Sequence, residues 1–269
     1  MNGASFRRGM TAIFRRECNQ WFRSPLAWSI IAIFAFLGGF YLVVDLSMYT
    51  GILTLELKFL ASLFFVILPL LTMGSFAAER QQGTDKLLFT APIPLSAVVV
   101  GKYMAVALLF FCMMLTTIPH LIIILSLGGH VDRITAITYV NVILIGLAYL
   151  AIGLFLSALT NRQTIAALAT MLVLLSVNVL YATANVIGSF LARLVGWLDV
   201  ADVVSVTRQT AIGDGFAAGL KWLNPLARLE RLSEGIFDVT MVFYFVILIG
   251  GFLALTVQSL ELRKWKIGK

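Results

Sequence analysis

Six long runs of apolar residues constrain this chain more than any other feature of its sequence. Each run is about 20 residues long, which is the length of helix that crosses a hydrocarbon core of about 30 Å. Lipid offers an open backbone no hydrogen-bond partner, and the ten-residue alternating segments of a β-barrel are absent, so we expect helices. The predicted spans are approximately Leu26 to Val44, Phe59 to Ala78, Tyr103 to Leu127, Ile137 to Leu159, Thr164 to Ala184 and Val239 to Leu260.

Composition supports an all-α integral membrane protein. Hydrophobic residues make up 60% of the chain and charged residues 12%, whereas roughly 25% of a soluble domain is charged. The two cysteines, Cys18 and Cys112, fall in a predicted cytoplasmic helix and in a predicted span. They therefore imply no disulfide framework.

Basic residues indicate the orientation of the spans, because Lys and Arg are hard to move across a membrane. With the N-terminus inside, thirteen of the twenty Lys and Arg residues fall in inner segments and seven in outer ones. We therefore predict that both termini are cytoplasmic, in a bacterial inner membrane or plasma membrane. The net charge of +7 follows from this topology and from contact with anionic lipid, so it does not predict nucleic-acid binding. The first run is of full span length and lacks a small-residue cleavage pattern, so we expect it to be a span and not a signal peptide.

Residues 1–25 are predicted to form an amphipathic helix on the inner leaflet. Its apolar residues recur at spacings of three and four with Arg7, Arg8, Arg15 and Arg16 between them, and it ends at Pro25. A simple anchor and a partner-binding element are equally good interpretations. The candidate residues of this interfacial helix are Phe6, Met10, Phe14, Glu17 and Trp21.

The longest stretch between predicted spans is residues 185–238, which we expect on the outer side. Val186 to Val200 is apolar but short, and it contains Arg193, which would cost roughly 3 kcal/mol at a bilayer centre. We expect this part to lie in the outer interface or to dip partway into the membrane, with Trp197 and Trp222 at interfacial depth. Asp199 and Asp202 could share a helical face, where a solvated surface is the better interpretation than a cation site.

The segment 79–102 between the second and third predicted spans is polar, short and closed by Pro92 and Pro94. Such a segment forms a compact knob that another protein could bind. The order of an acidic residue, Gly83-Thr84, Leu87-Leu88, Thr90-x-Pro92 and Gly101-Lys102-Tyr103 resembles the loop after the second span of ABC-2-type transporter permeases. The helix that bears Glu17 and ends in Arg-Ser-Pro is also similar to that family, as is the region from Gly235 to Trp265. The subgroup that the chain most resembles contains the gliding-motility and nitrous-oxide-reductase maturation permeases.

The resemblance implies an ABC-2 (type V) exporter-like fold, with six transmembrane helices and an N-terminal interfacial helix. It also implies that the loop is a coupling helix that docks in an ABC ATPase subunit, and that a second permease copy completes the complex. ATP and Mg²⁺ would bind to that ATPase, and this chain would hold no cofactor and no metal. The coupling residues implied are Glu79, Gln82, Gly83, Thr84, Leu87 and Leu88.

The sequence agrees that ATP binds elsewhere. Gly101-Lys102 is the pair that could suggest a phosphate loop, but Ser96 stands where such a loop needs glycine and Tyr103 where it needs Ser or Thr. No constellation of carboxylate, histidine or cysteine appears within the predicted spans, so we do not expect an enzyme.

Polar residues in or near spans are the candidates for a substrate pathway, because they are costly in lipid. Asn141, Asn178, Tyr181 and His120 are these residues. For Asn178 an interhelical hydrogen bond is the favoured alternative, and for His120 a satisfied or solvated side chain. Cys112, Met113 and Met114 point in different directions on a helix, so packing explains them better than soft-metal transport.

Two functions fit the sequence. The first is a permease subunit that couples ATP hydrolysis by a separate chain to export of a substrate, whose identity the sequence does not reveal. The alternative is a mechanotransmission complex that acts on an extracytoplasmic partner through residues 185–238 and moves no solute.

Overall fold

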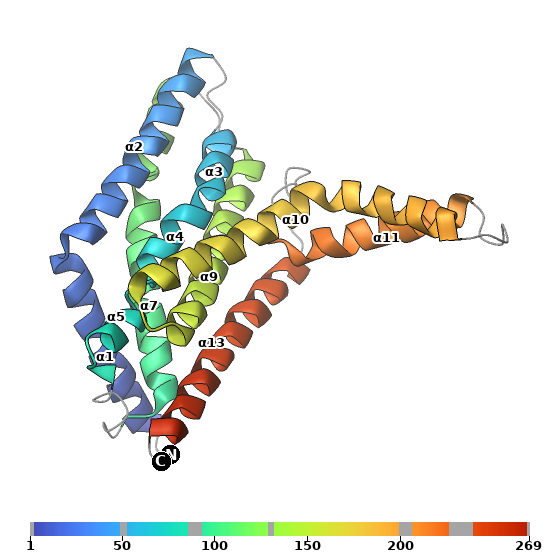
Figure 1. Cartoon of the computed structure of the whole chain (residues 1–269). Helices are drawn as coiled ribbons and strands as arrows, with labels where there is room; N and C mark the ends of the chain where they lie inside the picture. Colours follow the sequence, from blue (N-terminus) through green and yellow to red (C-terminus); the bar gives the residue numbers. More distant parts are fainter. Residues whose placement is uncertain are drawn as a thin grey trace.

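The computed structural model describes residues 3–48, 53–85, 93–128, 132–198, 206–225 and 239–267, and within these ranges the chain is helical without strands. Figure 1 shows that both chain ends lie at the same end of the helix bundle, which we call the terminal end. Five helical stretches are long and apolar enough to cross a membrane, and a bent pair makes a sixth if it is counted as one span. This agrees with the six predicted spans.

The first two helices meet at the turn that Pro25 predicts. Helix α1 spans Gly3–Arg23 and α2 spans Pro25–Ser47, with Ser24 between them as the N-cap. The Leu26 amide donates to the Ser24 hydroxyl, and Pro25 takes the first helical position, where a missing N–H costs nothing. The indole of Trp28 donates to the carbonyl of Phe22 across the turn, which fixes the angle between the two helices.

The second predicted span is not the single helix that hydropathy suggests. The chain forms α3 (Leu53–Ser62) and α4 (Phe64–Thr72), which are bent by 56° at Leu63. At the break the Ser62 hydroxyl donates to the Phe59 carbonyl, a group that a continuous helix would have bonded internally. The prediction of one helix from Phe59 to Ala78 was therefore wrong at both ends, and α5 (Ala77–Gln81) is a separate short helix.

The third predicted span is also broken, and it begins earlier than predicted. Helix α7 spans Leu95–Leu115 and α8 spans Ile118–Ser126. Pro119 has no N–H to give to the Leu115 carbonyl, which ends the first helix. At the break the Met114 carbonyl accepts from the amide and hydroxyl of Thr117 and also from the Tyr139 hydroxyl of α9. Because α7 already contains Leu95 to Lys102, the loop at the terminal end is shorter than the predicted segment 79–102.

Helix α9 (Arg133–Leu159) is the centre of the bundle. In its most apolar stretch 67% of the residues are buried, against 17% in α10 and in α13 (Val239–Ile267). Two glycines of α9 admit large neighbours: a Cβ at Gly146 would lie 2.1 Å from the Phe110 ring, and one at Gly153 would lie 2.2 Å from the Thr72 hydroxyl. These contacts hold α7 and α4 against α9.

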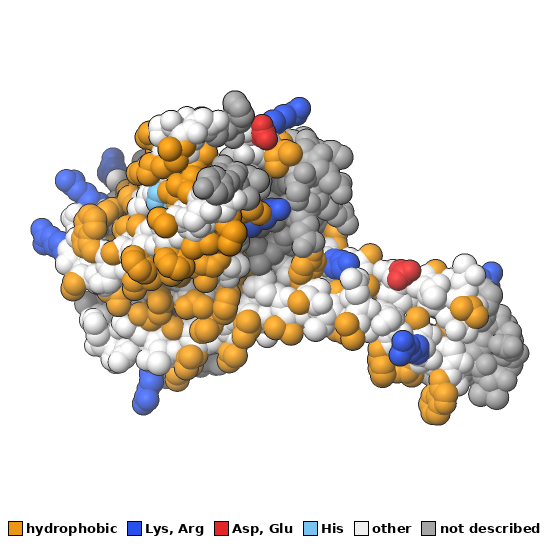
Figure 2. Space-filling view, turned by 90° about the horizontal axis from the view of Figure 1, so that it is seen from above, with side chains coloured by type: hydrophobic (Ala, Val, Ile, Leu, Met, Phe, Trp, Pro, Cys, Tyr) orange, Lys and Arg blue, Asp and Glu red, His pale blue; other side chains and the backbone are white. Residues whose placement is uncertain are grey.

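The fifth predicted span continues far beyond Ala184. Helix α10 spans Gln163–Leu198, a length of about 54 Å at 1.5 Å per residue, and α11 (Val206–Leu223) packs beside its second half. We call residues 185–198 of α10 together with α11 the arm. Figures 1 and 2 show the arm reaching away from the rest of the bundle. Residues 185–238 therefore do not begin as a separate outer segment, because neither proline nor paired glycine ends the helix at Asn185.

The two helices of the arm touch through glycine. A Cβ at Gly188 would lie 2.5 Å from the Gly213 carbonyl, and one at Gly213 would lie 2.3 Å from the Gly188 carbonyl. Small residues that let helix backbones meet are typical of helix pairs in membranes. The outer surface of the arm exposes Phe190, Trp197 and Ile212, among hydrophobic and charged side chains that Figure 2 shows along its length.

Candidate functional site

Four charged side chains meet at the terminal end of the bundle, and we call them the charged junction: Arg16 and Glu17 of α1, Glu79 of α5 and Lys102 of α7. The Lys102 Nζ lies 2.8 Å from Glu17 Oε1 and 3.0 Å from Glu79 Oε1. It also donates to the Ser75 carbonyl at 2.6 Å and lies 5.2 Å from the centre of the Phe76 ring. With its side chain only 1% exposed, Lys102 is a buried cation that three separate segments surround.

The junction keeps Glu17 ionised. Burial alone would raise the pKa of this carboxyl, but the charge of Lys102 and the hydrogen bonds from Arg16 and Lys102 outweigh burial and lower it. Arg16 Nη2 lies 2.7 Å from Glu17 Oε1 and also pairs with Glu79. A buried pair of this kind contributes to stability only while both partners stay charged.

Helix α1 reaches Lys102 because its backbone can approach α7 closely. A Cβ at Gly101 would lie 2.9 Å from the Met10 carbonyl and 3.1 Å from the side chain of Ile13. A Cβ at Gly9 would lie 2.7 Å from Ile93. Ile13 itself is buried in an apolar cluster with Val98, Val99 and Leu260. The Gly101-Lys102 pair therefore supplies both the space for α1 and the cation that α1 binds.

Helix α5 is held at both of its ends. The Ser157 hydroxyl accepts from the amides of Phe76 and Ala77 at 3.1 and 3.2 Å and donates to the Met73 carbonyl, so it caps the start of α5. At the other end Gly83 has φ = +71°, and the Thr84 amide donates to the Glu79 carbonyl at 2.9 Å. The Gly83 amide donates to the Arg80 carbonyl at 3.0 Å. These two bonds form a Schellman motif, which requires a left-handed residue at this position.

Three other spans also hold α5 and the turn after it. The Arg80 guanidinium donates to the Thr160 carbonyl at the end of α9, and burial lowers the pKa of Arg80 to about 10 with a further contribution from the charge of Arg263. The Gln163 amide at the start of α10 donates to the side chain of Gln81. Arg263 of α13 donates to Asn161 and lies 3.5 Å from Asp85. A displacement of α5 would therefore act on α1, α7, α9, α10 and α13 together.

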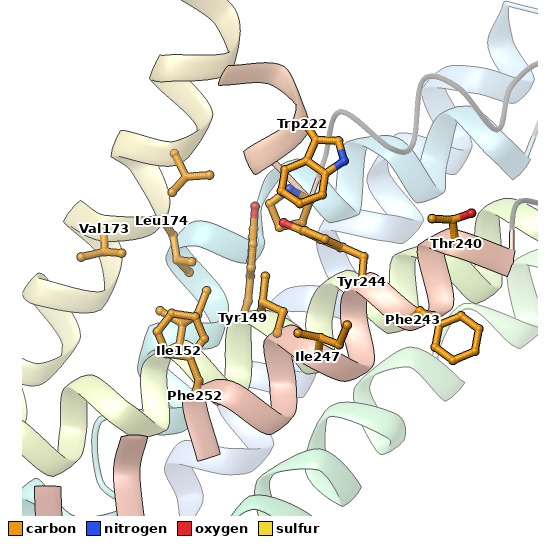
Figure 3. A pocket seen from close by; sticks show the side chains of 13 residues that line it. Tyr149, Ile152, Val173, Leu174, Trp222, Thr240, Phe243, Tyr244, Ile247 and Phe252 are labelled. Atoms are coloured by element: carbon orange, nitrogen blue, oxygen red, sulfur yellow. The ribbon is translucent and has the colours of Figure 1, made fainter. Parts of the chain in front are cut away.

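An apolar cavity of about 510 Å³ lies between α9, α10, the end of α11 and α13, farther from the terminal end. Its lining includes Tyr149, Leu174, Trp222, Tyr244 and Ile247. Figure 3 shows the Tyr149 hydroxyl pointing toward Trp222 and Tyr244, whose rings meet edge to face with centres 5.6 Å apart. The volume is within the range of small-molecule pockets, about 300 to 1,000 Å³.

A family model described as ABC-2 family transporter protein matches residues 25–206, which is more than half of the chain. The chain belongs to the ABC-2 transporter family. It is a multi-pass membrane protein of the type that serves as the membrane subunit of an ABC transporter. No curated protein matches the sequence.

In this ABC-2 protein the predicted coupling residues fall in two groups. Glu79 is a half-buried member of the charged junction, whereas Gln82, Gly83 and Thr84 are exposed at the turn after α5. Leu87 and Leu88 lie outside the described residues. The match does not distinguish subgroups, so the resemblance to the gliding-motility and nitrous-oxide-reductase maturation permeases stays a prediction.

The predicted residues of the interfacial helix all lie on α1. Glu17 is buried in the charged junction, and Phe6, Met10, Phe14 and Trp21 are half-buried. Trp21 packs against the main apolar core of the bundle. Helix α1 is therefore docked along this side against α7, and Arg7, Arg8 and Arg15 are exposed.

The three pathway candidates do not form one site. Asn141 is buried in α9, and neither its oxygen nor its nitrogen has a hydrogen-bond partner among the described residues. Asn178 of α10 lies 3.5 Å from the amide of Asn224, whose nitrogen also donates to the Val177 carbonyl at 3.0 Å. Asn224 directly follows α11, so this contact joins α10 to the residue after α11 and is not the hydrogen bond between two helices that the sequence favoured for Asn178. Tyr181 is half-buried on α10 and does not line the apolar cavity.

Sequence reasoning missed two functional groups. Lys102 was noted as an inner basic residue and in the Gly101-Lys102-Tyr103 pattern but not as the partner of an ion pair, although its place one position before a predicted span was a signal for a buried cation. Glu56 precedes the second predicted span, which was expected to begin near Phe59, but α3 begins at Leu53 and buries it. His120, which was expected to be satisfied or solvated, forms a 2.6 Å contact with this carboxylate.

Proposed function

We propose that this ABC-2 permease subunit couples ATP hydrolysis in a separate ATPase chain to export of a substrate, and that the charged junction carries the coupling. The observation that supports this most is that Lys102 binds Glu17 of α1 and Glu79 of α5 at the same time. A force applied to the turn after α5 reaches α1 through one buried cation. It reaches α9 and α13 through Arg80 and Arg263.

The terminal end is the cytoplasmic side in this proposal, and the membrane is the bacterial inner membrane or plasma membrane. The exposed turn at Gln82, Gly83 and Thr84 would contact the ATPase, which binds ATP and Mg²⁺. Helix α1 would lie along the inner leaflet beside the ATPase. A second copy of the permease, or a related chain, would complete the pathway. Closure of the ATPase pair on ATP would then select between two arrangements of the spans.

The apolar cavity supports an apolar or amphiphilic substrate over a polar one. Its walls are mostly aliphatic and aromatic side chains from four helices, α9, α10, α11 and α13, and its hydroxyl groups come from Tyr149, Tyr244 and Thr240. A hydrophilic solute would lose its hydration in such a cavity with few hydrogen bonds to replace it.

The test is reconstitution of the permease with its ATPase in vesicles. We expect ATP-dependent accumulation of an apolar or amphiphilic probe, and we expect Glu79→Gln to reduce both transport and the stimulation of ATPase activity by the permease. A matched control is Glu261→Gln, which removes an exposed carboxylate from α13 at the same end. Wild-type coupling in Glu79, Gly83 and Leu87 variants would contradict the assignment of the coupling segment.

The arm supports a second candidate function, mechanotransmission to an extracytoplasmic partner without solute transport. It projects from the bundle (Figure 2) and exposes Phe190 and Trp197 beside Arg193. In that case vesicles would show ATP hydrolysis without accumulation of any probe, and hydrolysis would rise only when the outer partner is added. ATP-dependent flux that persists in arm variants, with no response to a partner, would favour the exporter.

A further inference from the structure

A second pair of ionisable groups lies at the opposite end of the bundle from the charged junction. His120 Nδ1 of α8 is 2.6 Å from Glu56 Oε1 of α3. The Glu56 side chain is 2% exposed and the His120 side chain 12%. A Cβ at Gly38 of α2 would lie 3.1 Å from His120 Cε1 and 3.2 Å from Glu56 Oε1. The absence of a side chain at Gly38 therefore leaves the space in which the pair meets.

The Glu56 carboxylate is not fully satisfied by this contact. Its second oxygen, Oε2, is buried and has no hydrogen-bond partner among the described residues. Asp45 of α2, which is also buried, interacts electrostatically with Glu56 and carries the same charge. A buried carboxylate with an open oxygen and a like charge nearby depends strongly on a positive partner. Among the described residues, Glu56 Oε1 contacts His120, whose imidazole supplies a positive charge when both of its nitrogens carry a proton.

The elements packed around Glu56 differ in the charged groups that they carry. Helix α4 contains no charged residue. Helix α9 packs against α3 through Thr135, whose hydroxyl lies 3.1 Å from that of Thr54, and Arg133 at the start of α9 is exposed. On α3 itself Lys58 is half-buried, and Lys58 and Asp45 each have an interaction of their own. While Glu56 is ionised, a protonated His120 makes the Glu56–His120 pair neutral, and an unprotonated His120 leaves one buried negative charge on it.

The pair joins two helices that can move. Helix α3 is bent by 56° from α4, and α8 is separated from α7 by the break at Thr116 and Thr117. Each is one part of a broken span, and breaks in spans supply the hinges at which membrane helices change direction. The Glu56–His120 contact links these two halves beside α2.

We propose that Glu56 and His120 form a proton-binding site that latches α3 to α8 while the imidazole is protonated and releases them when the proton leaves. The proton enters through His120, which has the exposed edge, and the carboxylate behind it holds the imidazolium. Loss of that proton leaves the Glu56 charge uncompensated next to Asp45, which favours separation of α3 from its neighbours. The site does not depend on the charged junction or on the proposed ATPase coupling.

The chemical test is nitrogen NMR of the full chain in nanodiscs with labelled histidine. The chain contains only two histidines, so His130→Gln leaves a single imidazole. We expect His120 to lose its charge at a different pH in Glu56→Gln than in the His130→Gln parent. Asp132→Asn removes an exposed carboxylate at the same end and should not change the titration. Identical titration of His120 with and without the Glu56 carboxylate would overturn the proposal.

The mechanical test measures the separation of α3 and α8 by spin labels. Leu55→Cys and Ile122→Cys place labels at exposed positions, 39% and 60%, in a chain whose own Cys18 and Cys112 are replaced by alanine. We expect the distance to lengthen as the pH rises through the titration of His120, and the distance in His120→Gln to be long and insensitive to pH. A wild-type distance that stays constant while His120 titrates, or a His120→Gln distance that still follows pH, would refute the latch.

Discussion

The Nζ of Lys102 and the Oε1 of Glu17 lie 2.8 Å apart, although 85 positions separate the two residues in the sequence. This contact is the point at which the amphipathic helix α1 is bonded to the transmembrane bundle by charge and not only by apolar packing. Glu79 shares the same cation. An element at the membrane surface and the segment proposed to receive the ATPase therefore act on one residue.

Replacing Lys102 by glutamine should uncouple these elements and destabilise the protein. Arg16, whose side chain is 50% exposed, would be the one cation left in contact with the Glu17 carboxylate. Removing one partner of a buried ion pair lowers the free energy of unfolding by about 3 kcal/mol. We expect a lower midpoint of thermal unfolding and loss of ATPase stimulation in the reconstituted complex. The double variant Lys102→Gln/Glu17→Gln should recover part of the stability, because no unpaired carboxylate remains on α1.

The control for this substitution is Lys264→Gln, which changes an exposed lysine of α13 at the same end. It should leave both the unfolding midpoint and the stimulation unchanged. Equal effects of Lys102→Gln and Lys264→Gln would show that the buried position of Lys102 has no special role.

The contribution of Glu17 to the stability of the folded protein should disappear in acid. Lys102 and Arg16 lower the pKa of Glu17 against the opposing effect of burial. The stability that the ionised carboxylate provides is therefore complete above the pKa of an unperturbed glutamate, about 4.3. It is lost as the pH falls from there through the lower pKa of the folded state. The difference in unfolding midpoint between wild type and Glu17→Gln should be constant near neutral pH and shrink below about pH 4. A difference that shrinks instead between pH 5 and 7 would assign the effect to another group.

The sequence predicted the parts of the fold that depend on composition and local chemistry. The six spans, the turn at Ser24 and Pro25, and the positions of α9 and α13 follow from apolar length and from proline. The breaks at Leu63 and Thr116 did not follow from hydropathy, because a bent span and a straight one contain the same apolar residues. Pro119 was a local signal for the second break.

The partners of the charged junction could not be predicted, because they come from distant parts of the chain. Glu17 and Glu79 were identified from a resemblance, but nothing in the spacing of the sequence pairs either of them with Lys102. The arm was missed for a different reason. The end of an apolar run does not by itself end a helix. No proline follows Ala184 to end α10, which continues to Leu198.

Gly101→Ala should detach α1 from α7. The new Cβ would lie 2.9 Å from the backbone oxygen of Met10, and a backbone atom cannot move aside as the end of a side chain can. Cys18 of α1 is half-buried, so its labelling by a thiol reagent should become faster when α1 moves away. Gly250→Ala adds the same methyl group on α13 where nothing lies within 4 Å, and it should leave the labelling rate unchanged.

Gly83→Ala should weaken the turn after α5 without any steric clash. A Cβ at Gly83 meets nothing within 4 Å, but the residue has φ = +71°, which costs an alanine about 1 kcal/mol. We expect weaker binding of the ATPase to the permease, with an intermediate effect for Gly83→Asn because asparagine tolerates this conformation better. Equal binding by all three proteins would show that the turn is not part of the contact.

Gly213→Ala should open the arm, and it offers the best distinction between the two proposed functions. The new Cβ would lie 2.3 Å from the Gly188 carbonyl, so the two helices must separate. Gly219→Ala on the same helix has nothing within 4 Å and should, if anything, stabilise α11 by up to about 1 kcal/mol. A Cβ at Gly196 would lie 2.6 Å from the Gln209 side chain, so cross-linking between cysteines at these two positions, compared with the same pair in the Gly219→Ala background, measures the separation. If the permease exports a substrate through the bundle, Gly213→Ala should retain ATP-dependent flux while cross-linking falls. If the arm transmits force to an outer partner, partner-stimulated ATP hydrolysis should fall with the cross-linking.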